Sequence, residues 1–352
     1  MSPTSYLLLY PAIWTAKIQR FYSSLQEKLK FILKNILKYS TTISYLLKAQ
    51  NQKTNYLCSM THKAGFVNII GNPNVGKSTL MNALVGEKLS IITSKAQTTR
   101  HRILGIVNDD DYQIIFSDTP GIIQPAYQLQ ESMMDFVKSA FEDADVLIYM
   151  VEMGEKELKN EAFFNKIINL KIPVILLLNK IDTSNQDDVE EKLAYWTEKV
   201  PNASVFIISA LAKFNIDVVL NKIIECLPES PAFYPKDQLT DKPERFFVNE
   251  KIREKILMHY KKEIPYSVEV ETEEFVEEEK IIRIRSVIMV ERETQKGIII
   301  GHKGTAIKRV GTEARKDLEQ FFEKKVFMEL YVKVNKNWRN DKTQLKRFGY
   351  KD

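Results

Sequence analysis

The octapeptide at residues 71–78, Gly-Asn-Pro-Asn-Val-Gly-Lys-Ser, constrains the fold more than any other stretch of this sequence. It matches the phosphate-binding pattern G-x-x-x-x-G-K-[ST] at every fixed position. An apolar run at 67–70 precedes it, and apolar residues three and four positions apart follow it at 79–85, which is typical of a helix. A glycine loop between a strand and a helix directs backbone N–H groups at a phosphate. The sequence therefore predicts a nucleotide-binding α/β domain.

Individual residues of this loop have expected roles. Lys77 should reach the β- and γ-phosphates, and the Ser78 hydroxyl should ligate Mg²⁺. The remaining residues expected to contact the nucleotide here are Asn72, Asn74, Val75, Gly76 and Thr79.

Short apolar segments alternate with amphipathic patterns after the loop. Strands are predicted at 103–107, 112–116, 146–151, 174–178 and 205–208. Helices are predicted near 131–142, 157–170, 187–199 and 215–227. This alternation indicates a doubly wound, mainly parallel sheet whose second and third strands form a hairpin. Ligands of such sheets bind beyond the carboxyl ends of the strands, where the other motifs lie.

Two short motifs predict the metal site and the γ-phosphate sensor. The first, Asp-Thr-Pro-Gly at 118–121, directly follows a strand, so Asp118 can hold Mg²⁺ through water and the Gly121 N–H can contact the γ-phosphate. The second, Gln-Thr-Thr-Arg at 97–100, offers a threonine to complete the metal shell, and we favour Thr99 over Thr98. The predicted metal ligands are Ser78, Thr99 and Asp118, and the predicted catalytic residues are Lys77, Thr99, Asp118 and Gly121.

The base-recognition residues follow the strand at 174–178. A carboxylate at Asp182 can accept from both N1–H and the exocyclic amine of guanine, and adenine offers neither donor, so the site should select GTP and GDP over ATP. Lys180 should lie along the base, and Asn179 should brace the loop. A further segment, Ser209, Ala210 and Leu211, should supply a backbone N–H for the guanine oxygen.

The position after Gly121 departs from the small Ras-like GTPases. Those proteins carry a water-orienting glutamine there, whereas this chain carries Ile122, which cannot bind water. Intrinsic hydrolysis should therefore be slow unless another group acts. Asn74 is a candidate ligand for a monovalent cation such as K⁺ that would fill this role; the alternative is that Asn74 only suits the turn.

A proline-rich segment at 229–243 reads as a linker to a second domain at 244–352. A helix is predicted at 244–262, strands at 266–274 and 281–291, a helical segment before residue 301, a helix at 305–322 and a last strand at 326–334. The element order is α-β-β-α-α-β. The turn Gly-His-Lys-Gly at 301–304 joins the two helices, and such G-x-x-G turns clamp a nucleic-acid backbone in KH domains.

Charge supports nucleic acid as the ligand of this second domain. Residues 296–352 contain fifteen Lys and Arg against seven Asp and Glu, although residues 60–352 as a whole contain 43 against 45. Ile298, Ile300, Ile307 and Val310 are expected to form an apolar groove for unstacked bases. The predicted RNA-binding residues are Ile300, Gly301, His302, Lys303, Gly304, Lys308, Arg309 and Arg315.

Residues 1–59 differ in composition from the predicted nucleotide domain at 60–228. They carry eight basic residues and one acidic residue, and a basic amphipathic helix is predicted around 25–37. Three interpretations stay open: a start codon assigned upstream of Met60, a targeting or membrane-contacting segment, and an additional ordered domain. The chain has only two cysteines, Cys58 and Cys226, without the spacing of a disulfide framework or zinc site, which indicates a reducing, intracellular setting.

From Lys63 onward, the chain resembles the Era family of bacterial GTPases, within the TrmE–Era class. The resemblance rests on residues 71–80, 95–102, 118–121, 179–182, 295–304, 313–317 and 345–350. It implies a Ras-like P-loop GTPase domain followed by an α+β type II KH domain. It also implies a monomer that binds the 3′ region of 16S rRNA, assists maturation of the 30S ribosomal subunit, and is cytoplasmic with peripheral inner-membrane association.

Two other functions remain as alternatives to this GTP-hydrolysing switch. An RNA-binding adaptor would keep its nucleotide as a structural element, which the predicted metal ligands disfavour. An RNA-modification GTPase would share the switch motifs but should lack the KH domain. Organellar targeting by residues 1–59 is the alternative to a bacterial-type location.

Overall fold

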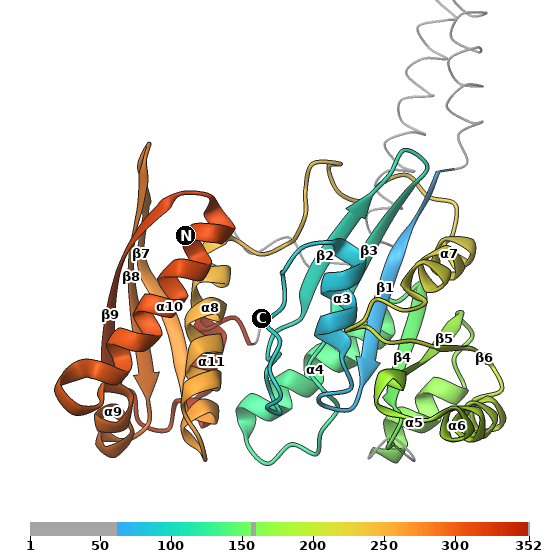
Figure 1. Ribbon diagram of the computed structural model, residues 1–352, viewed down its shortest axis with the longest axis horizontal. Helices are drawn as coiled ribbons and strands as arrows, with labels where there is room; N and C mark the ends of the chain where they lie inside the picture. Colours follow the sequence, from blue (N-terminus) through green and yellow to red (C-terminus); the bar gives the residue numbers. More distant parts are fainter. Residues whose placement is uncertain (1–61, 156–159, 351–352) are drawn as a thin grey trace, which may run out of the picture. The chain divides into compact units, whose positions relative to one another are not determined.

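A computed structural model describes residues 62–155 and 160–350 of this chain (Figure 1). The predictions for residues 1–59 lie outside the described residues, as does the beginning of the helix predicted at 157–170. Cys226 is a free thiol, and Cys58 is not among the described residues. No helix in the ranges just given is long and apolar enough to cross a bilayer.

The first domain contains a six-stranded sheet with the strand order β2-β3-β1-β4-β5-β6 (Figure 1). Its strands are β1 (Lys63–Gly71), β2 (Ile103–Asn108), β3 (Tyr112–Asp118), β4 (Val146–Glu152), β5 (Val174–Asn179) and β6 (Ala203–Ile207). Only the pairing of β2 with β3 is antiparallel. The predicted doubly wound sheet with one hairpin is therefore confirmed, although β6 begins two residues earlier than expected.

Helices cover both faces of this sheet, which explains why β4 and β5 are almost unbroken apolar runs. The helices are α3 (Lys77–Val85), α4 (Gln128–Glu142), α5 (Glu161–Ile168), α6 (Gln186–Lys199) and α7 (Ile216–Cys226). Along β4, Ile148 and Met150 enter the core beneath α3 and α7, whereas Leu147 and Tyr149 enter the opposite core with α4 and α6. A strand buried on both faces needs an unbroken apolar run rather than an alternating one.

The second domain contains a three-stranded sheet, β7-β8-β9, with the first three α-helices of the domain packed on one face (Figure 1). Its elements are α8 (Glu244–His259), β7 (Glu269–Glu277), β8 (Ile281–Val290), α9 (Glu293–Ile300), α10 (Thr305–Phe322) and β9 (Lys325–Val334). Strands β8 and β9 are parallel, and β7 is antiparallel to β8. The predicted order α-β-β-α-α-β is confirmed.

The boundaries of two predicted elements differ because a short turn lies between them. Helix α8 ends at His259, and a 3-10 turn at Ile264–Tyr266 containing Pro265 delays the start of β7 to Glu269. A further short helix, α11 (Lys342–Arg347), was not predicted.

The segment predicted as a linker lies along the edge of the six-stranded sheet. The N–H of Ile106 in edge strand β2 donates to the Leu239 carbonyl at 2.8 Å, and the Thr240 hydroxyl donates to the Leu104 carbonyl at 2.7 Å. The buried Gln113 side chain accepts from the backbone N–H groups of residues 233 and 234. Unpaired backbone groups of an edge strand are thereby satisfied within the chain.

Candidate functional site

The glycine loop occupies the end of β1, where two glycines permit close backbone approaches. Gly76 has φ +106°, and a Cβ there would lie 2.4 Å from Nδ2 of Asn179. A Cβ on Gly71 would lie 2.2 Å from the carbonyl oxygen of Met150 in β4. Neither position accepts a side chain without displacing a neighbour, so both glycines are required for the loop to form between β1 and α3.

Lys77 is buried inside this loop. Its ammonium donates to the carbonyl oxygens of Gly71, at 3.1 Å, and Asn72, at 2.8 Å. Burial lowers the pKa of Lys77 to about 8, and the nearby carboxylates of Asp118 and Glu155 only partly oppose this effect. A bound phosphate would add counter-charge in direct contact with the ammonium, whose hydrogen-bond acceptors here are backbone carbonyls, and would raise its pKa again.

The predicted metal ligands converge from three elements of the first domain. Ser78 Oγ, at the start of α3, lies 2.7 Å from Oδ2 of Asp118 at the end of β3 and 2.9 Å from Oγ1 of Thr99. Thr99 Oγ1 also lies 3.4 Å from Asp118 Oδ2. The Thr98 hydroxyl instead donates to the Lys95 carbonyl at 2.6 Å.

This cluster has the chemistry that Mg²⁺ requires. All its atoms are hard oxygen donors, and Asp118 Oδ1 is buried without a hydrogen-bond partner. Burial raises the pKa of Asp118, while the hydrogen bond from Ser78 opposes that rise. A cation beside Ser78, Thr99 and Asp118 would both satisfy the unpaired oxygen and favour the ionised carboxylate.

The segment after β3 lies directly against the glycine loop. A Cβ on Gly121 would be 2.7 Å from the backbone of Pro73, and the Ile122 N–H donates to the Gly71 carbonyl at 3.1 Å. The Ile122 side chain is fully buried in the core formed with Leu129 and neighbouring α4 residues. Ile122 therefore faces the protein interior and not the phosphate site.

The Asn179 side chain joins the two ends of the predicted nucleotide site. Its Nδ2 donates to the Val75 carbonyl in the glycine loop at 2.7 Å, and its Oδ1 accepts from the Ala210 N–H at 2.9 Å. Asp182 is exposed on the short turn Ile181–Thr183 and accepts from the Ser209 hydroxyl at 2.6 Å. The structure thus brings the two predicted base-binding segments together.

Three other predicted nucleotide contacts lie on the surface of this site. Lys180 has φ +66° and forms an ion pair with Glu152 at the end of β4. Leu211 is 82% exposed. Asn74 donates from its side chain to the Ser94 carbonyl at 2.9 Å, which ties the glycine loop to the segment before Thr99.

Glu155 is a residue of this site that the motifs did not reveal. Its carboxylate accepts from the Asn72 side chain in the glycine loop and from the Glu152 N–H. Burial raises the pKa of Glu155 to about 7. The available sequence signal was its place just beyond the carboxyl end of strand β4, where ligands of such sheets bind.

This raised pKa predicts a specific pH dependence for the nucleotide-free protein. The pKa of Glu155 is 4.5 for an exposed carboxyl and about 7 in the folded protein. Between these pH values the folded state binds a proton that the unfolded state has lost, so the free energy of unfolding falls as pH rises. Glu155→Gln removes the titrating group and with it this pH dependence. The free energy of unfolding of the variant minus that of the wild type should therefore increase by about 2–3 kcal/mol between pH 4.5 and pH 7.

Urea denaturation at a series of pH values measures this difference. Glu190→Gln is the matched control, because Glu190 is exposed on α6 and contacts Gln186 on the same helix. Equal pH profiles for the two variants would contradict the assigned pKa of Glu155.

The candidate nucleic-acid interface is the turn between α9 and α10. Gly301 has φ +71°, and a Cβ there would lie 2.6 Å from the Cβ of Ala306. Gly304 has φ +77°, with open space at its Cβ position. His302 and Lys303 are exposed between them. The turn thus presents its backbone and two side chains at the surface.

Only some of the predicted RNA-binding side chains of α10 lie close to this turn. Lys308 and Arg309 are exposed on the first turns of α10. Arg315 pairs with Glu319 at 2.9 Å and lies about 15 Å along the helix from its start, given a rise of about 1.5 Å per residue. The structure therefore places Arg315 apart from the other predicted contacts.

The expected apolar groove needs one correction. Ile298 is exposed, and Ile300 and Ile307 are half-buried, as surface contacts require. Val310 is buried in the core with Ala314, because it faces the sheet one turn further along α10. The prediction that Val310 borders the groove was wrong.

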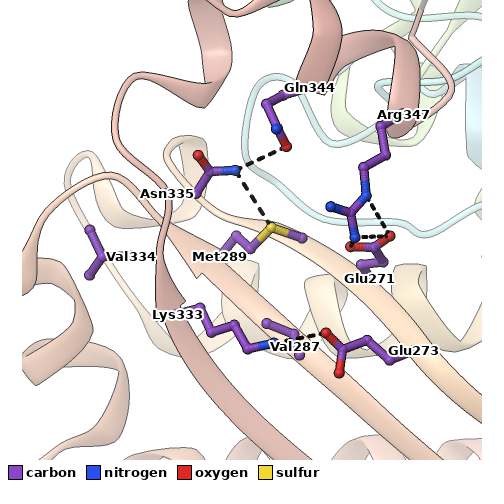
Figure 2. Close-up of a pocket in the computed structure, with 9 residues that line it drawn as sticks. All are labelled: Glu271, Glu273, Val287, Met289, Lys333, Val334, Asn335, Gln344 and Arg347. Atoms are coloured by element: carbon purple, nitrogen blue, oxygen red, sulfur yellow. Dashed lines mark hydrogen bonds and ion pairs between the residues drawn. The ribbon is translucent and has the colours of Figure 1, made fainter.

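A separate cavity of about 200 Å³ lies between β7, β8, β9 and α11 (Figure 2). Its four charged side chains pair with one another, Glu271 with Arg347 at 2.6 Å and Glu273 with Lys333 at 2.8 Å. The first pair joins α11 to the sheet and the second joins β7 to β9, so these four side chains offer no unpaired charge to a ligand.

Comparisons with known proteins agree with this two-domain description. Residues 66–180 match the family model described as 50S ribosome-binding GTPase, and residues 263–339 match the KH domain model. The chain is 42% identical to GTPase Era of Alkaliphilus metalliredigens over 294 residues, which cover 83% of this chain and 100% of that protein. It is 44% identical to GTPase Era of Thermoanaerobacter sp., covering 83% and 97%.

Two solved structures are similar along nearly their whole length. One is Era in complex with MgGDPNP and nucleotides 1506–1542 of 16S ribosomal RNA, at 39% identity and a TM-score of 0.79. The other is a variant of Aquifex aeolicus Era bound to GDP·AlF4⁻, also at 39% identity and a TM-score of 0.79. Each match covers 82% of this chain and 99% of the chain in the solved structure.

Proposed function

The chain is a GTPase of the Era family, and from this membership we propose that it is a GTP-dependent switch that binds the 3′ region of 16S rRNA and assists maturation of the 30S subunit. The observation that supports the proposal is that one chain brings together the residues expected to hold the phosphates, Mg²⁺ and guanine, and also carries an exposed G-x-x-G turn. A similar solved protein binds a fragment of that same RNA. The chain thus has both parts that such a switch needs.

We infer the following roles within the GTP site. Lys77 binds the phosphates, and Ser78, Thr99 and Asp118 hold Mg²⁺, which neutralises charge on the phosphates. The Gly121 N–H contacts the γ-phosphate. Asp182 selects guanine, while Asn179 fixes the loops on both sides of it.

Hydrolysis needs a group other than residue 122, because the Ile122 side chain is fully buried and apolar. We propose that K⁺ bound near Asn74 supplies positive charge beside the phosphates. Asn74 supports this proposal because it is exposed, with φ +67°, in the glycine loop that is expected to bind the phosphates. The alternative, that Asn74 only suits the turn, predicts no cation dependence.

Steady-state GTP hydrolysis with and without a 3′-terminal 16S rRNA fragment tests the proposal. We expect multiple turnovers, binding of the fragment, and faster hydrolysis in K⁺ than in Na⁺ at equal ionic strength. Tight nucleotide binding without turnover, with RNA present, would instead favour the adaptor. Crosslinking in cells should give reads concentrated at the 3′ end of 16S rRNA, and reads scattered without a ribosomal peak would contradict the ribosomal role.

We further infer a monomer located in the cytoplasm with peripheral association at the inner membrane, on the strength of family membership. Organellar targeting by residues 1–59 remains the alternative. Mass spectrometry of the native N-terminus distinguishes the interpretations of residues 1–59. An extension that has been cut within these residues supports targeting, whereas a chain that begins at Met60 supports a start codon assigned too far upstream.

A further inference from the structure

Arg253 of helix α8 extends from the second domain to the segment that contributes Thr99. Its Nη2 donates to the carbonyl oxygen of Thr98. The same guanidinium is paired with Glu250, with Nε 2.7 Å from Oε1. The side chain is 1% exposed, so these bonds are shielded from water. Burial opposes the positive charge, but Glu250 outweighs burial and raises the pKa of Arg253, so the guanidinium stays protonated.

Two more cations hold the same segment on the second domain. Arg100 is also 1% exposed and donates to the carbonyl oxygens of Val268, at 2.7 Å, and Pro265, at 3.1 Å. Lys95 donates to carbonyl oxygens at the end of α8, where the helix dipole favours a cation. Residues 95–100 are therefore held at three points by charge-assisted hydrogen bonds.

The bond to Thr98 acts on the next residue through the peptide plane. The peptide unit joining Thr98 to Thr99 is planar, so fixing the Thr98 carbonyl also fixes the direction of the Thr99 N–H and narrows the positions open to its side chain. The Thr99 hydroxyl is 2.9 Å from Ser78 and 3.4 Å from Asp118. A shift of this peptide would separate Thr99 from the other two metal ligands.

We propose that Arg253 is a positioning residue for GTP hydrolysis, holding the Thr98 carbonyl so that the Thr99 hydroxyl stays beside Ser78 and Asp118. Arg253 itself contacts none of these three hydroxyl and carboxylate oxygens. The second domain thereby completes the metal site of the first. This inference rests on the proposed function, because it assigns control of the same GTP site.

Removing the guanidinium tests the proposal. Arg253→Met combined with Glu250→Gln avoids leaving a buried carboxylate unpaired. We expect this double variant to hydrolyse GTP about 10- to 100-fold more slowly, the cost of a small displacement at a reacting site. Its affinity for GDP should stay within about twofold, because the contacts with base and glycine loop are unchanged, whereas a general structural defect would lower both.

A second readout does not depend on activity. The Mg²⁺ concentration needed to raise the melting temperature with a non-hydrolysable GTP analogue should increase several-fold in the double variant. Arg253→Lys, which keeps a donor toward Thr98, should recover part of this response. Arg245→Met is the matched control, since Arg245 is exposed on the same helix and donates to the carbonyls of residues 272 and 273 of the second domain.

Two outcomes would overturn the positioning role. One is a double variant that matches Arg245→Met in both hydrolysis and Mg²⁺ response. The other is a parallel loss of GDP affinity and activity, which would mark Arg253 as a general stabilising residue. Failure of the wild-type chain to turn over GTP or bind the rRNA fragment would instead contradict the proposed function, and the Mg²⁺ response of the analogue complex would still report on Arg253.

Discussion

Replacing Asp182 with asparagine should change the preferred nucleotide from GTP to xanthosine triphosphate. The carboxylate is expected to accept two hydrogen bonds from guanine. An asparagine amide would instead point an N–H donor at the exocyclic amine of guanine, which is also a donor, and this N–H would suit the carbonyl that xanthine carries at the same place. We expect GTP affinity to fall by about 10²- to 10⁴-fold, with a gain for the xanthosine nucleotide, since mismatched polar groups in such sites discriminate strongly. Calorimetric titration with both nucleotides measures the ratio.

Asp187→Asn is the matched control for this change. Asp187 is exposed in the first turn of α6, five residues from Asp182, and carries the same charge. It should leave the ratio of the two affinities unchanged. If Asp182→Asn behaved like this control, Asp182 would have no part in base recognition.

Reversing the charge at the G-x-x-G turn should abolish most RNA binding. His302→Asp together with Lys303→Asp places two carboxylates where the turn is expected to meet phosphates, so affinity for the 16S rRNA fragment should fall by about 100-fold. The salt dependence of binding should also weaken, because a cationic contact is lost. Fluorescence anisotropy at several salt concentrations measures both effects.

A control for overall charge is available in the same domain. Lys280→Asp with Lys336→Asp changes the net charge at least as much, at two exposed positions outside the helices. This pair should weaken binding only through long-range electrostatics. Comparable losses in the two double variants would mean that the basic surface as a whole, and not the turn, holds the RNA.

Local patterns were sufficient to predict most of the secondary structure. The strands of the first domain were found because each is a short apolar run bounded by turn residues, and the second domain was found from its element order. Helix α11 was missed because six residues are too few to show helical periodicity. Its start did carry a signal, since Asp341 caps it by accepting from the N–H groups of Thr343 and Gln344.

The site was predictable where a residue acts through a motif and not where it acts through a distant contact. Ser78, Thr99 and Asp118 were predicted from three short motifs, and the structure places their oxygens together. Arg253 is 155 residues from Thr98, and no local pattern links the two. Glu155 escaped notice because a carboxylate after a strand is common, and only its buried contact with Asn72 distinguishes it.

The strap of residues 229–243 along β2 has a consequence for how this protein can be divided. A first domain cut at residue 228 would lose the carbonyl of Leu239 and the hydroxyl of Thr240, leaving the backbone of Ile106 and Leu104 open to pairing with a second copy. The segment that links the two domains therefore also prevents self-association through β2. Any fragment intended to remain dispersed in solution has to retain it.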